Sequence, residues 1–494
     1  MNQFNLIDEP WIPVVGEKAA SLRDIFSTNE PSELGGTPIQ KLAVLKLLLA
    51  IAQRASTPTD QMHWNTLGSN GIGNHCLAYL EANHACFFLY GERPFLQYPI
   101  LEQIKTHKGE PIAVMPIGKA YHPDIPAENE TVINQYHVNR VPTDAEKALF
   151  LISVMNYNSG GKRVAHVPPL SPHFTTKGKS AKPGPSLGNY TGYAQSCLWG
   201  TSILETVWLN MFTKEDFAKY PQWYDDPVPP PWELMPTGED DDIARVLKNS
   251  HMGTLVSMSR FTLLKDDGVL FTEGIQYPSH KEGWREPFMS FKKDGKVLFL
   301  DTSKKPWRNL DALLSLSFAE TDRGFTCMQV HEFLLRARSA VPSFGVWSGG
   351  LQVRGTAGDQ SVKQSDDFIE SVVFLDSKVL GASWFKTLES EIAWLESTGF
   401  TLKMSVKRYY QELNEKKAPI DAVATARYWE YCETIFQSLV DACTDEDALL
   451  RIRRKIAEKA DDLYNTFCSR DTARQIVAWV KNRPVVKRIT KGEE

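Results

Sequence analysis

The uneven distribution of proline constrains what this chain can fold into more than any other feature of its sequence. Of its 29 prolines, only Pro419 and Pro484 follow Asp376. Proline interrupts helices and is excluded from central strands. The proline-rich first 370 residues, in which short β-like runs mix with helical stretches, are therefore predicted to form an irregular α+β domain. The remainder is predicted to be helical.

Apolar residues recur at helical spacing throughout that remainder and form stripes along amphipathic helices. The stripes are Phe385, Leu388, Ile392 and Leu395, followed beyond Gly399 by Leu402, Val406 and Tyr409; Tyr428, Cys432, Ile435, Leu439 and Ala442; and Leu449, Ile452, Ile456, Ala460, Leu463 and Phe467. A last helix is expected between Asp471 and Pro484. The predicted fold class is an α+β N-terminal body, residues 1–370, followed by an all-α C-terminal four-helix bundle, residues 371–494.

Three shorter patterns predict local structure. Thr444, three residues before Asp447, resembles a capping box at the start of a helix. The largely apolar stretch 42–52 is predicted to be a buried helix. Residues 288–291 and 297–300, on either side of Asp294-Gly295, are predicted to form a hairpin.

The charge is distributed in patches. Its net value is −5, which does not suit a free-standing nucleic-acid binder. However, residues 147–204 hold six Lys or Arg and no Asp or Glu, and residues 451–494 hold twelve Lys or Arg against six acids. Such a bipolar chain fits a partner in a nucleoprotein assembly.

The start of the chain has no basic segment followed by an apolar stretch, and no apolar run approaches the roughly 20 residues that a membrane helix needs. The expected compartment is the cytoplasm, with no membrane contact. Seven cysteines, an odd number that includes no Cys-x-x-Cys pair, predict reduced thiols.

Neither a metal site nor a catalytic site is predicted. His75, Cys76, His84 and Cys86 lie close in sequence, but their spacing fits no standard zinc pattern and the residues around them indicate helix and buried core. The sequence holds no phosphate-binding, zinc-protease or serine-hydrolase motif. No cofactor is therefore expected, and the chain is predicted not to be an enzyme.

Four landmarks occur in an order that identifies a family. They are residues 4–14 (FNLIDEPWIPV), residues 92–97 (ERPFLQ), residues 306–310 (PWRNL), and a Gly349-Gly350 turn leading to Asp359-Gln360-Ser361. The first indicates two short strands around a turn. Together they make the chain resemble the large subunit of type I-E CRISPR Cascade complexes, which inspects duplex DNA.

The resemblance implies a DNA-contacting loop at Gly160, Gly161 and Lys162, within the acid-free segment. In the family, a glycine-containing loop here lies in the minor groove beside the PAM, the short motif that marks a target. Glycines let a backbone approach closely, and a lysine can meet phosphates. The alternative is a solvated basic loop.

The resemblance also implies a wedge at Asp359, Gln360 and Ser361, where turn-forming residues predict an exposed hairpin tip. The family places a glutamine wedge here, so Gln360 would split the first base pair beyond the PAM. Unstacking one base step costs a few kcal/mol. The alternative is an ordinary surface loop, and Asp359 brings a negative charge to a phosphate-rich site.

Three further sites are candidates. Lys265 falls near a PAM-side lysine of the family, although a surface ion pair with Asp266 or Asp267 is the alternative. His137, Val138 and Asn139 match a loop that reaches towards the 5′ handle of the CRISPR RNA and the neighbouring backbone subunit; a buried strand end is the alternative. In the basic C-terminal region, Arg453, Arg454 and Lys455 are candidates for DNA phosphate contacts.

The predicted function is that of a non-catalytic DNA-surveying subunit. The guide RNA reads the sequence by base pairing while this protein reads the PAM through the minor groove, and the wedge starts strand separation. The implied partners are the CRISPR RNA 5′ handle, PAM-containing double-stranded DNA, the other Cascade subunits and the helicase-nuclease that Cascade recruits. Two alternatives are a structural scaffold that ignores DNA sequence and an unrecognised nucleic-acid enzyme.

Overall fold

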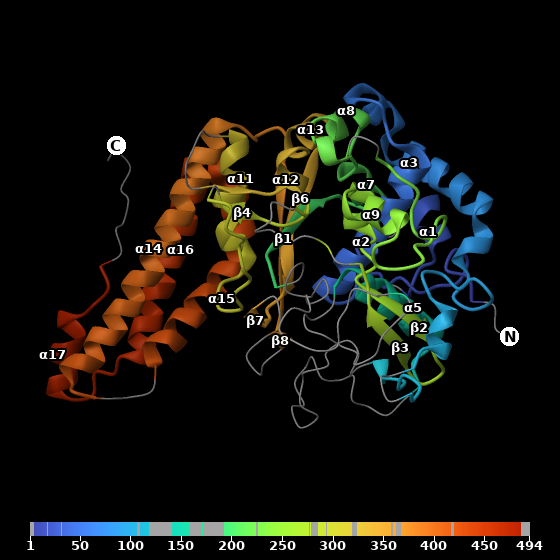
Figure 1. The fold of residues 1–494 in the computed structure, drawn as a ribbon. Coiled ribbons are helices and arrows are strands. Elements are labelled where there is room, and N and C mark those ends of the chain that lie inside the picture. The colour runs from blue at the N-terminus through green and yellow to red at the C-terminus, as the bar shows by residue number, and fades with distance from the viewer. Residues whose placement is uncertain are drawn as a thin grey trace. The chain divides into compact units, whose positions relative to one another are not determined.

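The protein divides into two compact units in the computed structural model (Figure 1). The structure describes residues 4–16, 18–30, 32–105, 109–117, 141–157, 170, 192–223, 226–275, 277, 285–292, 294–318, 324–356, 359–361, 367–415 and 419–485. Unit 1 comprises residues 1–307 and 325–372. Unit 2 comprises residues 308–324 and 373–494, so the chain passes between the units at three points.

Helix α2 (Pro38–Ser56) is the centre of unit 1. Its first turn is fixed by a capping box in which Thr37 and Gln40 bond each other's backbone amides. Almost every residue from Pro38 to Gln53 is buried, which confirms the prediction for 42–52. Helices α3 (Gln61–Ala82), α5 (Asp144–Asn156), α7 (Ile203–Leu209) and α10 (His251–Leu255) pack around it. A helix apolar on all sides needs this enclosure.

The main sheet of unit 1 has the strand order β1-β6-β9, formed by β1 (Gln195–Trp199), β6 (Ser343–Leu351) and β9 (Phe368–Asp376). Strands β1 and β6 are antiparallel, with Gln195 opposite Gly349 and Trp199 opposite Gly345. In the part of the chain that the structure describes, three two-stranded ribbons accompany the sheet. They are β2 (Arg260–Leu264) with β3 (Val269–Glu273), β4 (Phe291–Lys292) with β5 (Phe325–Thr326), and β7 (Arg354–Thr356) with β8 (Asp359–Ser361).

Short helices complete unit 1. They are α1 (Leu22–Ser27), α8 (Lys214–Ala218), α9 (Asp242–Lys248), α12 (Met328–His331) and α13 (Leu334–Ala340), with the 3-10 turns η1 (His84–Phe87), η2 (Pro99–Gln103) and η4 (Pro221–Trp223). The turn η6 (Pro306–Asn309) spans the boundary between the units. The hairpin predicted at 288–300 is present, because Phe291 bridges Val297 and the Leu298 amide donates to the Ser290 carbonyl at 2.9 Å.

Among the described residues of unit 1, two ion pairs are fully buried. The Lys46 ammonium, on α2, is 2.7 Å from the Glu286 carboxylate, and both side chains are at most 1% exposed. The ammonium also donates to the Thr254 carbonyl at 3.2 Å. The second pair joins Arg260 to Glu273, which are register partners across β2 and β3. Buried charges need such partners because an isolated one would cost far more.

Unit 2 is helical. It contains α11 (Leu310–Phe318), α14 (Ala382–Glu412), α15 (Ile420–Asp441), α16 (Glu446–Phe467) and α17 (Ala473–Lys481), with the 3-10 turn η7 (Ala442–Thr444) before α16. Helix α14 packs against the other four, and α14, α15 and α16 run side by side in Figure 1. The apolar stripes predicted for this region are largely buried. The expectation of a mixed body followed by a helical C-terminal region is confirmed.

Two local predictions are wrong. The cap of α16 is Asp445, whose side chain accepts from the Ala448 amide at 3.0 Å, and Thr444 belongs to the preceding 3-10 turn. Gly349 and Gly350 lie inside strand β6 and form no turn. A Cβ on Gly349 would come within 2.7 Å of the Ile369 carbonyl, so glycine is needed for the close approach of β9.

The first landmark, residues 4–14, contributes isolated bridges in place of strands. Asn5 bridges Phe88, Ile12 bridges Ala20, and Val14 bridges Leu34. The Trp11 indole, almost fully buried, donates to the Leu6 carbonyl across the predicted turn.

All seven cysteines are free, as predicted. Among the residues that the structure describes, no helix is both long and apolar enough to span a bilayer.

Candidate nucleic-acid interface

The hairpin that carries Gln360 extends from the end of strand β6. Arg354 pairs with Ser361, Gly355 with Gln360, and Thr356 with Asp359, which confirms that a hairpin forms here. Asp359, Gln360 and Ser361, which were predicted to lie at its tip, form its second strand, β8. Figure 1 places β7 and β8 beyond the same end of β1 and β6. Residues 357 and 358, between the two strands in sequence, lie outside the described part of the chain.

Hydrogen bonds hold the base of this hairpin. The Gln352 amide donates to the Asp367 carbonyl at 3.1 Å, and the Gln352 side-chain oxygen accepts from the Thr302 amide at 2.7 Å. These bonds tie the hairpin base to the segment after residue 300 and to the start of β9. A ribbon anchored at its base presents its tip reproducibly, which a recognition element requires.

Two other predicted contact sites, Gly160-Gly161-Lys162 and His137-Val138-Asn139, lie outside the described residues. Lys265 lies at the turn between β2 and β3, where its amide donates to the Gly268 carbonyl at 2.9 Å. Its ammonium pairs with Glu102 of η2, so the ion pair is not the one with Asp266 or Asp267 that was the alternative to a DNA contact. Glu102 is remote in sequence, so no local pattern could indicate it.

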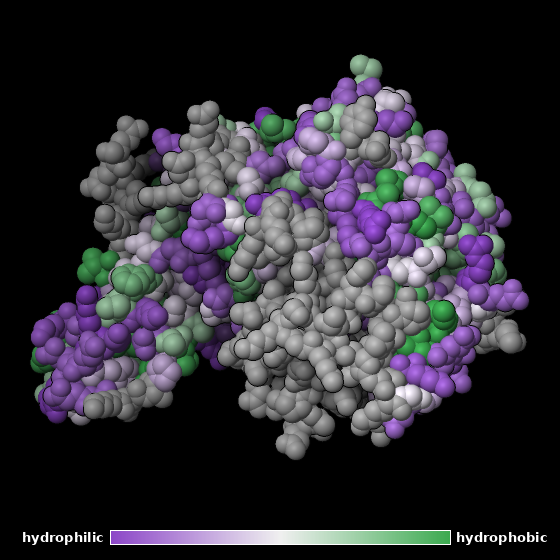
Figure 2. Space-filling view, in the orientation of Figure 1, coloured by the Kyte–Doolittle hydropathy of each residue, from purple (hydrophilic) through white to green (hydrophobic). Residues whose placement is uncertain are grey.

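The three basic residues of α16 have different surroundings. The Arg453 guanidinium donates to Glu391 of α14 at 2.8 Å, and the Glu391 side chain is fully buried. Arg454 and Lys455 are exposed. On the face drawn in Figure 2, hydrophilic side chains cover most of the helical unit near α17. Within this trio, Arg453 joins two helices, and the next two residues face solvent.

Two landmark motifs have structural roles. The buried Gln97 side chain donates to the Leu89 carbonyl and accepts from the Leu264 amide, each at 2.8 Å. Arg308 makes a two-pronged ion pair with Glu396 of α14 and lies 3.5 Å from the centre of the Trp429 ring. Both motifs therefore hold together segments that are distant in sequence.

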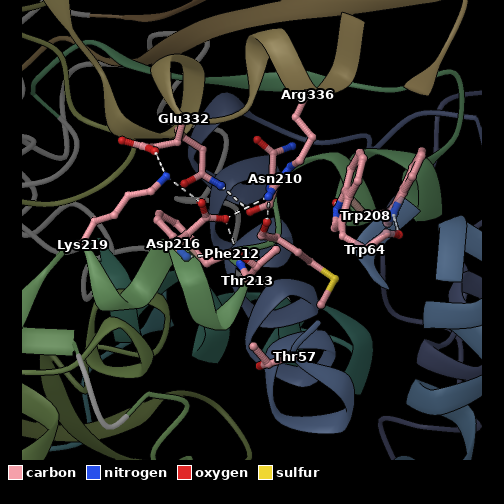
Figure 3. Close-up of polar contacts among 12 residues, drawn as sticks. Thr57, Trp64, Trp208, Asn210, Phe212, Thr213, Asp216, Lys219, Glu332 and Arg336 are labelled. Atoms are coloured by element: carbon pink, nitrogen blue, oxygen red, sulfur yellow. Dashed lines mark hydrogen bonds and ion pairs between the residues drawn. The ribbon is translucent and has the colours of Figure 1, made fainter. Parts of the chain in front are cut away.

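A charged network in unit 1 was not apparent from the sequence (Figure 3). The buried Arg336 guanidinium of α13 donates to Asp216 at 2.8 Å, and Lys219 bridges Asp216 and Glu332, each at 2.9 Å. Beside it, Trp64 and Trp208 stack with their centres 4.2 Å apart, and each indole donates to the other residue's carbonyl. The network joins the region of α8 to the region of α12 and α13, which follows more than 100 residues later in the chain.

The pKa values in this network follow from its geometry. Burial alone would raise the pKa of the Asp216 carboxyl, but Arg336, the Thr213 amide and Lys219 favour the charged form more strongly, so the pKa lies below its usual value. Burial lowers the pKa of Arg336. Since each charge has a partner, the network favours a structural role over a catalytic one.

No group of three or more His, Cys, Asp or Glu side chains could hold a metal ion within the described ranges. His75 and Cys76 lie in α3, and Cys86 lies in η1. Burial raises the pKa of the Cys76 thiol, which disfavours the thiolate that a metal would need.

A family model described as CRISPR-associated protein Cse1 matches residues 5–467, so the chain belongs to the Cse1 family. A curated relative, CRISPR-associated protein CasA/Cse1 of Thermus thermophilus, is 26% identical over 351 residues. That alignment covers 64% of this chain and 61% of the relative's length.

Solved structures share the fold over almost the whole chain. Thermobifida fusca Cse1 matches with a TM-score of 0.75 at 20% identity, over 97% of both chains. Thermus thermophilus CasA matches with a TM-score of 0.70 at 19% identity, over 97% of this chain and 98% of the other. A chain of a CRISPR RNA-guided surveillance complex matches with a TM-score of 0.68 at 18% identity, over 97% and 99%.

Proposed function

We propose that this protein is the DNA-surveying subunit of a type I-E Cascade complex and that the β7–β8 hairpin is its wedge. The observation that carries the proposal is this short two-stranded ribbon, which has Gln360 opposite Gly355 and an anchored base, in a chain of the Cse1 family. Gly355, opposite the glutamine, adds no side chain beside it on the same face of the ribbon, so a base pair can approach Gln360 closely.

In this proposal the protein reads the PAM through the minor groove, with Gly160, Gly161 and Lys162 as the contacting loop. The minor groove distinguishes A·T from G·C better than it distinguishes individual bases. The protein therefore accepts several related PAMs. Gln360, flanked by Asp359 and Ser361, then separates the first base pair, and Lys265 contributes a secondary contact.

Strand exchange with the guide RNA is nearly balanced in free energy, because the heteroduplex replaces a duplex of similar stability. A few kcal/mol gained or lost at the first base pair therefore decides whether the exchange proceeds. A wedge at that position can control target selection without any catalytic chemistry. We accordingly propose that the chain binds DNA and does not cleave it.

The proposal assigns the remaining partners by region. His137, Val138 and Asn139 contact the CRISPR RNA 5′ handle and the adjacent Cascade subunits, in the cytoplasm. Residues 371–494 act as a four-helix bundle that contacts DNA and helps recruit the helicase-nuclease. Because Arg453 is engaged by Glu391, we assign the phosphate contacts of the bundle chiefly to the exposed Arg454 and Lys455.

The test is binding of duplex DNA to a guide-loaded Cascade backbone, with and without this protein, on targets that differ only in a randomised PAM. Selective binding that requires the protein supports surveillance. Binding that is indifferent to the PAM supports the scaffold alternative, and metal-dependent cleavage by the purified chain would indicate an enzyme.

A second experiment isolates the wedge. Gln360→Ala is expected to slow opening of an intact duplex while leaving binding to a target already melted at its first positions nearly unchanged. Gln411→Ala, an exposed glutamine of α14, is the matched control. Equal effects of Gln360→Ala on both targets would remove Gln360 from this role.

A further inference from the structure

Helix α17 turns its apolar side chains towards solvent. Ile476, Val477 and Val480 are 47%, 62% and 63% exposed, and Ala473 is exposed as well. Ala478 is the buried residue of this helix. An amphipathic helix normally packs its apolar stripe against the rest of its own protein. In α17 the apolar stripe is the outer face.

The four exposed residues form one continuous stripe. An α-helix turns about 100° per residue, so positions 473, 476, 477 and 480 fall within an arc of about 100°. The centre of that arc lies about 150° around the helix from Ala478. Successive members of the stripe are three or four residues apart, which makes them neighbours on the helix surface.

The inner side of α17 is fixed by hydrogen bonds to α14 and α16. The Arg474 guanidinium donates to the Leu413 carbonyl at 3.1 Å. The Tyr464 hydroxyl donates to the Trp479 carbonyl at 3.0 Å, and the Trp479 indole donates to the Asn465 side-chain oxygen at 3.1 Å. The stripe is therefore presented in one orientation, which lowers the entropic cost of binding a partner.

Cations border the stripe. Residues 470–485 hold four Lys or Arg against one acid, a net charge of +3. Arg474 and Lys481 follow one margin, and the Arg470 and Arg483 guanidinium groups lie 4.7 Å and 5.2 Å from the centre of the Trp479 ring at the other. Lys481 and Arg483 are 61% and 52% exposed in their ion pairs. Exposed ion pairs are weak, so these cations can also meet an acidic partner.

The chemistry of this face favours a protein as its occupant. Nucleic acid is bound by cations and by aromatic rings that stack on bases, so DNA would leave a stripe of Ile and Val uncovered. A second copy related by two-fold symmetry would place the same positive charge against itself. A helix with an apolar stripe and acidic flanks complements both the aliphatic residues and the cations.

We propose that α17 is a docking element for an acidic amphipathic helix of a protein partner. Ile476, Val477 and Val480 pack against the apolar side of that helix, and Arg474 and Lys481 face its carboxylates. The nine residues of α17 rise about 13 Å, so the contact spans two to three turns. The proposal rests on the proposed function in that the chain works beside other proteins of its complex, and it does not require DNA opening.

The test measures the association of the full chain with the guide-loaded Cascade backbone, and of the complete complex with the helicase-nuclease. Val477→Glu should weaken one of these associations at least tenfold, because it interrupts the stripe and sets a negative charge against an acidic helix. Val477→Ile should remain near normal. Glutamate is a better helix former than valine, so an unchanged melting temperature is expected.

Val246→Glu is the matched control, because Val246 is 51% exposed on the helix α9 of unit 1. It should change neither association. Raising the salt concentration should weaken the association of the unaltered protein, since cations contribute to the contact.

Photocrosslinking in the complete complex will identify the occupant. Benzoylphenylalanine in place of Val477 should crosslink to a partner peptide that has apolar residues at helical spacing and flanking Asp or Glu. The same group in place of Val246 should not reach that peptide. A crosslink to DNA, to a second copy or to residues 486–494 of the same chain would overturn the proposal.

Unchanged association of Val477→Glu with both partners would also overturn it. PAM selectivity, measured on the same preparations, separates this result from the proposed function. Association that depends on Val477 in a complex indifferent to the PAM would remove surveillance and leave the docking element. PAM-selective binding with no partner at α17 would remove the docking element and leave surveillance.

Discussion

Units 1 and 2 place charge differently. In unit 1, Lys46 and Glu286 are both withdrawn from water, and they join a central helix to a segment 240 residues away. In unit 2, Arg308 pairs with a Glu396 that is 40% exposed, and Arg453 is 19% exposed while Glu391 is buried. Pairs between helices in unit 2 keep some access to water, whereas those in the core of unit 1 have none. Loss of one partner should therefore cost most in unit 1.

The largest expected effect is from Lys46→Met. Removing one partner of a buried ion pair leaves the other charge uncompensated and typically costs about 3–5 kcal/mol. Burial already lowers the pKa of the Lys46 ammonium, and Glu286 is what keeps its charge favourable. Urea unfolding followed by tryptophan fluorescence will measure the loss. The double variant Lys46→Met with Glu286→Gln should recover much of it, and a stable single variant would contradict the comparison.

In unit 2, the most informative comparison is between the stabilities of Arg453→Gln and Arg454→Gln, because the two residues are adjacent on α16. Arg453→Gln leaves Glu391 buried without its partner and should cost about 3 kcal/mol. Arg454→Gln should leave stability within about 0.5 kcal/mol while reducing the salt dependence of DNA binding. Equal stability of the two variants would show that the Arg453–Glu391 pair does not hold the helices.

The buried His251 of unit 1 predicts that the stability of the protein depends on pH. Burial, and then the charge of Lys46, lowers its pKa to about 3, against an ordinary value near 6.5 in the unfolded chain. Below pH 6.5 the unfolded state binds a proton that the folded state does not, so stability falls by about 1.4 kcal/mol per pH unit as pH drops towards 3. His251→Phe, among Phe212, Phe217 and Trp223, should flatten this slope by one proton. An unchanged slope in urea titrations from pH 6 to 4 would contradict it.

The smallest expected effect comes from Gly399→Ala in unit 2. A Cβ there would lie 2.9 Å from a Tyr428 ring carbon and 3.0 Å from a Trp429 ring carbon. Overpacking costs about 1–3 kcal/mol, while replacing a helical glycine with alanine gains about 1 kcal/mol. A net loss near 1 kcal/mol is expected in chemical denaturation. Gly71→Ala in α3, where the nearest atom lies at 3.4 Å, should stabilise the protein, so the two substitutions should differ in sign.

The sequence predicted the helices well because amphipathic periodicity is a local property. Proline depletion and the apolar stripes located α14, α15 and α16, and turn-forming residues located the hairpin that carries Gln360. The glycine pair at 349 and 350 was wrongly predicted to be a turn, since the need for glycine at position 349 comes from β9, some 20 residues later.

Charged side chains were the hardest to interpret. Arg453 and Arg454 look alike in sequence, and only the position of Glu391, 62 residues earlier, separates a helix contact from an exposed cation. Arg336 and Asp216, or Lys265 and Glu102, meet only after the chain has folded. A site built on exposed cations therefore needs the tertiary structure before its members can be told from internal ion pairs.

The discontinuity of unit 2 has a consequence for how the gene can be divided. Helix α11 packs against α14, and its Leu310, Leu313 and Leu314 are almost fully buried. A segment that encodes only residues 373–494 would lack this helix and expose the surface that it covers. Recombination between relatives, or a designed exchange of the helical unit, must therefore transfer residues 308–324 as well. Three crossover points are needed, at residues 307/308, 324/325 and 372/373, the last inside β9, which makes the helical unit hard to inherit separately from the rest of the protein.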